Sequence, residues 1–235
     1  MLVLQGFPCS WGRCTFCPFG LEQSVNISEV IEKNRGVIRE ALKLLDSCRP
    51  TRVSVFNGSS FYELPVDTLA ALRPLTEGRV VDIEVRPEYV TLDTLKWTIE
   101  VLGAKMLVVR VGFEVWDEKL RNEYLRKGIP QSEVQRVAQV AREAKLRGLP
   151  VKMLVYVLFG IEGVPEEEVI RSVREYNKLF DGVIAVRYHR YHPRHPRETR
   201  VSKKLAEFLE TNTVLVDWGE EPEWEIAGKK PGISD

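Results

Sequence analysis

The sequence predicts an α/β protein whose parallel strands form an open or partial barrel of six strand–helix units. Short apolar runs rich in β-forming residues alternate with amphipathic helical stretches along the whole 235-residue chain. Strand–helix repeats in series imply parallel strands joined by right-handed crossovers. Six units are fewer than the eight of the usual closed barrel, so a partial barrel is favoured, and a flat doubly wound sheet is the alternative.

Each expected element follows from its local pattern. The expected strands span residues 2–5, 52–56, 80–85, 106–111, 151–159 and 182–188. The expected helices span residues 28–47, 65–75, 92–102, 117–147, 165–179 and 199–210, and the fourth is broken at Pro130. Asn26 followed by Glu29 predicts a capping box at the start of the first helix. Pro65 and Pro165 stand where a first helical turn begins.

The composition describes a soluble globular chain. Hydrophobic residues make up 44% and charged residues 29%, and the 34 Lys and Arg balance 34 Asp and Glu, which argues against a general nucleic-acid coating protein. The longest apolar runs, such as residues 153–159, are far shorter than the ~20 residues of a membrane span, and no signal-like segment opens the chain. We therefore expect a cytoplasmic protein with no membrane contact. No linker divides the chain, so we expect one core domain over residues 1–212 and a C-terminal strand with an acidic tail over residues 213–235.

Three of the four cysteines follow directly on the first expected strand, in the segment Cys9-Ser-Trp-Gly-Arg-Cys14-Thr-Phe-Cys17. Thiolates are the usual ligands of iron–sulfur clusters and of structural zinc. Three close cysteines can hold three corners of a [4Fe–4S] cluster and leave one iron open, whereas a closed zinc site, the alternative, needs a fourth ligand. Cys48 could supply that ligand, but it ends the first expected helix, at the opposite end of a β/α unit, and we expect it to be a buried free cysteine.

Polar and small residues follow several of the later expected strands. The segment after the second strand lets the backbone approach a ligand closely or forms a plain polar turn, and it contains Asn57, Gly58, Ser59 and Ser60. Glu84 and Arg86 share one face at the end of the third strand, where they bind a ligand or pair with each other. Glu114, after the fourth strand, can accept hydrogen bonds from hydroxyl groups or is an exposed loop acid. Ile161, after the fifth strand, either lies near a bound ligand or simply packs in the apolar core.

These motifs together resemble the radical S-adenosylmethionine (SAM) superfamily. The cysteine triplet, with Phe16 before its last cysteine, is similar to the superfamily signature, although its gaps are four and two residues instead of the commonest three and two. The segments Gly-Ser-Ser-Phe, Glu-x-Arg-Pro-Glu-Tyr, Gly-Phe-Glu and Lys-Gly occur in the expected order over residues 5–165. In this order they are similar to the elongator catalytic-subunit-like and archaeosine synthase group, which suggests an archaeal-like protein.

The resemblance implies the partial TIM-like barrel of the radical SAM core. It implies a [4Fe–4S] cluster held by Cys9, Cys14 and Cys17, whose open iron chelates SAM. The implied SAM contacts are Phe16, Asn57, Gly58, Ser59, Ser60, Glu84, Arg86, Glu114 and Ile161. Reductive cleavage of SAM, with an electron from an external donor, would give a 5′-deoxyadenosyl radical that abstracts hydrogen from an unidentified substrate. Modification of tRNA is one possible reaction, a partner subunit could complete the substrate site, and no catalytic side chain is assigned.

A basic segment follows the sixth expected strand and carries all three histidines, His189, His192 and His195. From residue 186 to residue 204, seven Lys or Arg face one acid, a local net charge of +6. Interleaved tyrosines and arginines can bind phosphate or nucleotide groups, which favours a ligand-facing loop. The alternatives are a second metal site, held by the histidines, and a solvated basic face that balances the acidic tail (Glu220, Glu221, Glu223, Glu225). The alternative function for the whole chain is a non-catalytic, zinc-stabilised module that binds RNA or protein.

Overall fold

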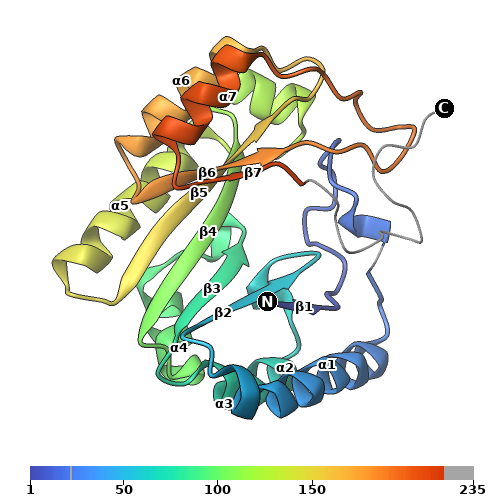
Figure 1. Cartoon of the computed structure of the whole chain (residues 1–235), viewed down its shortest axis with the longest axis vertical. Coiled ribbons are helices and arrows are strands. Elements are labelled where there is room, and N and C mark those ends of the chain that lie inside the picture. Colours follow the sequence, from blue (N-terminus) through green and yellow to red (C-terminus); the bar gives the residue numbers. More distant parts are fainter. Residues whose placement is uncertain (22, 220–235) are drawn as a thin grey trace.

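The computed structural model describes residues 1–21 and 23–219 and contains one parallel sheet whose seven strands lie in sequence order. The strands are β1 (Leu2–Leu4), β2 (Arg52–Asn57), β3 (Val80–Val85), β4 (Met106–Glu114), β5 (Val151–Phe159), β6 (Gly182–Arg187) and β7 (Leu215–Asp217). Every neighbouring pair is parallel, and the sheet curls into a half-barrel (Figure 1). The predicted partial barrel is therefore confirmed, and β7 lies in the segment expected to form a C-terminal strand after the six units.

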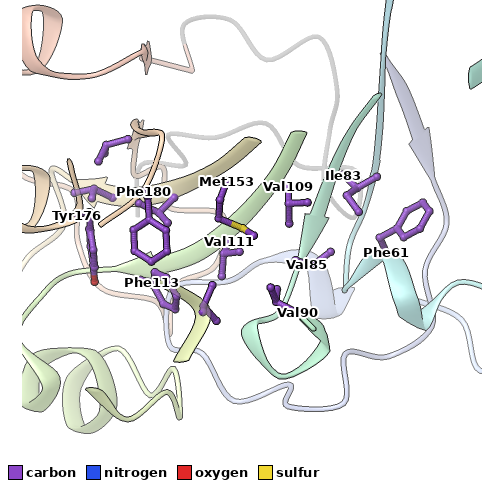
Figure 2. Packing of buried hydrophobic residues seen from close by; sticks show 14 of the residues in the cluster. Phe61, Ile83, Val85, Val90, Val109, Val111, Phe113, Met153, Tyr176 and Phe180 are labelled. Atoms are coloured by element: carbon purple, nitrogen blue, oxygen red, sulfur yellow. The ribbon is translucent and has the colours of Figure 1, made fainter. Parts of the chain in front are cut away.

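Helices cover the convex face of this sheet (Figure 1). They are α1 (Ile27–Cys48), α2 (Val66–Ala71), α3 (Arg73–Thr76), α4 (Leu92–Leu102), α5 (Gln131–Leu146), α6 (Glu166–Asn177) and α7 (Lys203–Asn212). Strand alternation sends every second side chain toward these helices, and Ile83, Val109 and Met153 lie in the resulting core (Figure 2). Side chains of the opposite parity face the concave side. A small second cluster, built on Val108 and Leu154, lies there.

The start of α1 is fixed by the cap that the sequence predicts. The Asn26 side chain accepts hydrogen bonds from the backbone N–H groups of Ser28 and Glu29. Glu29 does not reach back to complete a capping box, because its carboxylate bonds to Ser24 and Lys33 instead. A side-chain cap of this kind contributes about 1 kcal/mol to helix stability.

Two expected helices differ from the observed ones. The segment 65–75 forms α2 and α3, which are separated at Leu72; Pro74 lies in the first turn of α3 and has no N–H to continue the α2 hydrogen-bond ladder. The first half of the segment 117–147 contains only a π-helical turn, Leu120–Tyr124, and α5 begins after the predicted break at Pro130.

Cys48 contradicts the prediction of a buried core cysteine, because it is exposed. The buried side chains that the structure describes in α1, Val30, Asn34 and Ile38, lie ahead of its last two turns. In the last turn of α1, Leu45 is half-buried against the core, whereas Ser47 and Cys48 are exposed, so Cys48 lies off the buried face of the helix.

The acidic tail at Glu220, Glu221, Glu223 and Glu225 lies outside the described residues. Across residues 1–21 and 23–219, no helix combines the length and the apolar character that crossing a membrane requires.

Candidate functional site

The segment that carries the three clustered cysteines, residues 9–17, is here named the cysteine loop. It follows β1 and lies beyond the carboxyl ends of the strands (Figure 1). Cys9, Cys14 and Cys17 are free thiols, each half-buried. Burial raises the pKa of the Cys14 thiol, and it raises the pKa of Cys17 to about 12. The neighbouring Cys14 and Cys9 contribute to this raised pKa of Cys17, and a backbone hydrogen bond from Phe19 and the charge of Lys127 oppose it.

The donor set of the cysteine loop suits a group that takes three thiolate ligands. Among the residues that the structure describes, no three His, Cys, Asp or Glu side chains stand as a ready-made set of metal ligands. The chemistry of the loop nevertheless favours a cluster over zinc. A closed zinc site needs four ligands, whereas a cubic cluster with one open iron needs three. Cys48 is exposed at the end of α1, so it supplies no fourth thiolate at this edge of the sheet.

An ion pair beside the cysteine loop joins Glu114 at the end of β4 to Lys127. Lys127 Nζ lies 2.6 Å from Glu114 Oε1, and both side chains are largely buried. The register shifts between Gly112 and Glu114, and Glu114 adopts a left-handed φ of 68°, so the strand end turns the carboxylate out of the regular ladder. A Cβ at Gly112 would lie within 2.8 Å of both charged groups, so the pair fits because Gly112 has no side chain. Glu114 is buried, so the alternative that it is an exposed loop acid is wrong.

Lys127 also connects this ion pair to the cysteine loop. Its Nζ lies 5.4 Å from the centroid of the Phe16 ring. Its positive charge opposes the burial that raises the pKa of Cys14. The sequence motif around Lys127 marks a resemblance but assigns this residue no role. The residues next to Lys127 in the sequence do not indicate that its side chain contacts Glu114, 13 residues earlier at the end of β4.

A chain of charged and hydroxyl groups crosses the concave face of the sheet. Asp82 on β3 accepts hydrogen bonds from Arg52 on β2 and Arg110 on β4. The Arg110 guanidinium lies 3.4 Å from the Tyr156 hydroxyl, which donates to Glu84 Oε1 at 2.5 Å. Burial raises the pKa of Glu84, and the bond from Tyr156 limits that rise. Tyr156 has no place in the sequence-based site, although its parity on β5 puts it on the same face as Glu84.

Arg86 does not pair with Glu84. β3 ends at Val85, and Arg86 begins the 3₁₀ turn Pro87–Tyr89, so its side chain no longer follows the alternation of the strand. Arg86 Nε bonds to Glu88 Oε1 at 2.5 Å, and the guanidinium lies 5.6 Å from the centroid of the Trp11 ring. Arg86 therefore faces the cysteine loop.

The segment after β2, residues 57–60, forms a tight polar loop. The side-chain amide of Asn57 donates to Ser59 Oγ at 2.8 Å and to the carbonyl of Ser60 at 3.3 Å. The Oδ1 atom of Asn57 is buried and has no hydrogen-bond partner. Gly58 packs against Phe19, where a Cβ would lie 3.1 Å from the Phe19 Cβ. The loop combines the internal bonds of a polar turn with one buried acceptor that is left for a ligand.

Glu63 holds three loops together, and no sequence motif marks it. Its carboxylate accepts hydrogen bonds from the backbone N–H groups of Ser10 and Ser60 and from the Tyr89 hydroxyl, at 2.9–3.1 Å. Burial would raise the pKa of Glu63, but these hydrogen bonds outweigh it and lower the pKa. One carboxylate thus ties the cysteine loop to the loops after β2 and β3.

Ile161 and the basic segment lie together beyond β5 and β6. Ile161 is fully buried, and its backbone pairs with Glu198. Glu198 also lies 3.5 Å from Arg187 and 3.7 Å from His189, so part of the basic segment is neutralised within the fold. The His192 and His195 rings lie 5.5 Å apart, and burial lowers the pKa of His195. Three other arginines of the segment, Arg194, Arg197 and Arg200, are exposed, whereas Arg190 is half-buried.

Two curated relatives match the sequence. Archaeosine synthase subunit beta of Methanosarcina acetivorans is 26% identical over 184 residues, which are 73% of this chain and 52% of that protein. An uncharacterised protein of Methanocaldococcus jannaschii is 23% identical over 180 residues, 72% of this chain and 48% of that protein. The chain therefore spans about half the length of the curated relatives it matches. No protein-family model matches the chain.

Solved structures share the fold. A queuine lyase from Clostridium spiroforme, bound to SAM and queuine, superposes with a TM-score of 0.67 at 20% identity and covers 88% of this chain and 82% of its own. A radical SAM methyltransferase from Kitasatospora setae, with cobalamin and a [4Fe–4S] cluster bound, superposes with a TM-score of 0.51 at 14% identity over 80% of this chain and 34% of its own. These likenesses confirm the predicted partial TIM-like barrel.

Proposed function

We propose that the chain is a member of the radical SAM superfamily, close to its archaeosine synthase group, and that it is an enzyme that binds a [4Fe–4S] cluster and SAM. One observation carries the proposal. Three thiols without a fourth lie at the carboxyl edge of a parallel half-barrel, next to two acids at the ends of neighbouring strands, Glu84 and Glu114. In open α/β sheets and barrels, this edge is where ligands bind.

The cysteine loop holds the cluster through Cys9, Cys14 and Cys17. When bound, the cluster supplies the electron that cleaves SAM reductively, so that a 5′-deoxyadenosyl radical can take hydrogen from a substrate. The protein binds, orients and shields these groups. Partial burial of Cys14 and Cys17 raises their thiol pKa values, which Lys127 opposes in both. Cluster binding therefore has to drive the loss of the thiol protons.

The SAM contacts follow from the chemistry of each group. The unpartnered Oδ1 of Asn57 suits the ammonium group of SAM, and the small residues Gly58, Ser59 and Ser60 let that group approach. Glu114, and Glu84 across the concave face, offer carboxylate acceptors for ribose hydroxyls. The remaining proposed contacts are Phe16 and Ile161 for the adenine and Arg86 for the carboxylate.

The partners are proposed on a different basis. The relative from Methanosarcina acetivorans is named as a subunit of archaeosine synthase, which supports tRNA modification and a partner subunit here. The exposed arginines of the basic segment offer phosphate contacts at the same edge of the sheet. An external one-electron donor is required, and reduced cysteine ligands suit the cytoplasm.

Anaerobic reconstitution tests the proposal. The wild-type protein should bind about four irons per chain, absorb visible light and form 5′-deoxyadenosine from SAM when dithionite is added. A Cys14→Ala variant should lose both iron and SAM cleavage, while a Cys48→Ala variant, as the matched control, should keep both. Equal iron and equal cleavage in the Cys14→Ala protein would contradict the proposal. A colourless protein with one zinc per chain and salt-dependent RNA binding would instead support the zinc-stabilised module. Repeating the assay with bulk tRNA tests the substrate class.

A further inference from the structure

The cysteine loop is attached to a segment that lies more than 100 residues away in the sequence. This segment, residues 124–128, is here named the docking loop. The Trp11 indole N–H donates to the Arg126 carbonyl at 2.6 Å. Thr15 donates twice, from its backbone N–H to the Leu125 carbonyl at 3.1 Å and from its hydroxyl to the Tyr124 carbonyl at 3.0 Å. Three consecutive carbonyl groups of the docking loop thus hold both halves of the cysteine loop.

Trp11 fits directly against Gly128. A Cβ built on Gly128 would lie 2.2 Å from the Trp11 ring, and Gly128 has a left-handed φ of 68°. Any side chain at position 128 therefore collides with the indole as well as straining the backbone. The other flanks of the indole are covered by Arg13 and Arg86, whose guanidinium carbons lie 5.2 and 5.6 Å from the ring centroid.

The docking loop is itself fixed to the core. The Asn122 side chain donates to the Ile129 carbonyl and accepts from the Ile129 N–H, at 2.9 and 2.8 Å, which closes the segment between them. The Tyr124 hydroxyl donates to the Glu162 carbonyl at 2.6 Å, and Lys127 pairs with Glu114. The docking loop can therefore act as a rigid support.

This attachment also accounts for the four-residue gap between Cys9 and Cys14. Gly12 has a φ of 58°, and a Cβ there would lie 3.3 Å from the Cys9 carbonyl, so the gap contains a tight left-handed turn. The turn leaves Trp11 free to point at the docking loop. A four-residue gap accommodates both the turn and the outward indole.

We propose that Trp11 and Gly128 are positioning residues that dock the backbone between Cys9 and Cys14 before any cluster binds. The inference rests on the proposed function only for what the cysteines then bind. Docking lowers the conformational entropy that the loop would otherwise lose when the cluster assembles.

The first measurement uses the protein without its cluster. Alkylation rates of the individual cysteines are followed by peptide mass spectrometry in wild type, Gly128→Ala, Trp11→Phe and Gly148→Ala. Gly148 is the matched control, because it has a φ of 67° and nothing within 4 Å of a Cβ, so its substitution adds the same strain without a collision. We expect Gly128→Ala to speed alkylation of Cys14 about tenfold. The collision would cost the cysteine loop one hydrogen bond and one ring contact, and this loss would shift the equilibrium between its docked and open forms toward the open form by about that factor.

The other variants separate the collision from the hydrogen bond. Trp11→Phe keeps an aromatic ring but cannot donate to Arg126, so a smaller rise in Cys14 alkylation is expected. Gly148→Ala should label like wild type. After reconstitution, Gly128→Ala should retain less iron per chain than Gly148→Ala. Should Gly128→Ala fail to fold, Trp11→Phe decides alone.

Two outcomes are distinguishable. Wild-type alkylation rates in both Gly128→Ala and Trp11→Phe would overturn the docking inference, whatever cluster the protein binds. Accelerated alkylation in these variants, in a protein whose wild type binds no iron–sulfur cluster, would support docking and overturn the proposed function instead.

Discussion

Replacing Asp82 with Asn removes the charge at the centre of the concave face. The Asp82 side chain is fully buried and accepts four hydrogen bonds from two guanidinium groups. Arg52 contributes two of these bonds at 2.5 Å, and Arg110 contributes two at 2.7 and 3.1 Å. An amide of the same shape can accept from only one side and would turn its NH₂ group toward a guanidinium.

The cost depends on how far each arginine can return to water. The Arg52 side chain is 52% exposed and regains hydration easily, whereas Arg110 is 13% exposed and keeps a largely buried charge without its partner. We therefore expect the free energy of unfolding to fall by about 3 kcal/mol at pH 7, the low end for a broken buried pair. Burial alone would raise the pKa of Asp82, but the two guanidinium groups outweigh it and lower the pKa.

The lowered pKa fixes the pH dependence of this loss. A carboxylate with a lowered folded-state pKa stabilises the fold above its unfolded-state pKa, and this stabilisation disappears as the pH falls through the folded-state value. The difference in unfolding free energy between wild type and Asp82→Asn should therefore be largest at pH 7 and shrink below about pH 4. Urea unfolding followed by circular dichroism at both pH values measures it. Asp67→Asn, which breaks an exposed ion pair with Arg35, is the control and should cost less than about 1 kcal/mol. An Asp82→Asn protein as stable at pH 7 as the control would refute the reasoning.

Three further substitutions test the other polar contacts. Glu63→Ala leaves three donors without their acceptor, so the unfolding free energy should drop by about 2 kcal/mol and reconstituted iron should fall. Lys127→Met leaves Glu114 buried and unpaired, and urea unfolding should show a loss of about 3 kcal/mol that Glu114→Gln in the same protein largely restores. Tyr156→Phe removes the hydrogen bond that limits the raised pKa of Glu84. A raised carboxyl pKa destabilises the fold increasingly as the pH rises above the unfolded-state pKa. The variant should therefore lose more unfolding free energy, relative to wild type, at pH 8 than at pH 5. Equal losses at both pH values would contradict this last expectation.

Local patterns sufficed for most of the fold. The predicted strands at residues 80–85 and 151–159 and the helix at residues 92–102 coincide with β3, β5 and α4. Their ends carry strong local signals, such as the capping hydroxyl of Thr91 and the left-handed Gly103 after α4. Local patterns failed where a proline or a strand end changed the geometry. Arg86 follows the parity of Glu84 only as long as the strand continues, and β3 stops one residue earlier.

The contacts that shape the candidate site were hidden for a different reason. Ser10 meets Glu63 across 53 residues, and Trp11 meets Arg126 across 115. Each partner is unremarkable in its own sequence window, and only the curling of the sheet brings the loops after β1, β2 and β4 to the same edge. A motif can therefore mark the cysteines, while the residues that hold the cysteine loop become visible only in three dimensions.

The two faces of the sheet divide stability from chemistry. The convex face carries the large apolar core against the helices, and substitutions there, such as at Val109, should lower stability without altering the site. The concave face places charged side chains, from the half-exposed Arg52 and the buried Asp82 through to Glu84, where a sheet would otherwise bury apolar side chains. These groups contribute less to stability than apolar packing of equal volume, because pairing only offsets their desolvation. Their arrangement along a line toward the cysteine loop is therefore better explained by what the open face binds than by what holds the fold together.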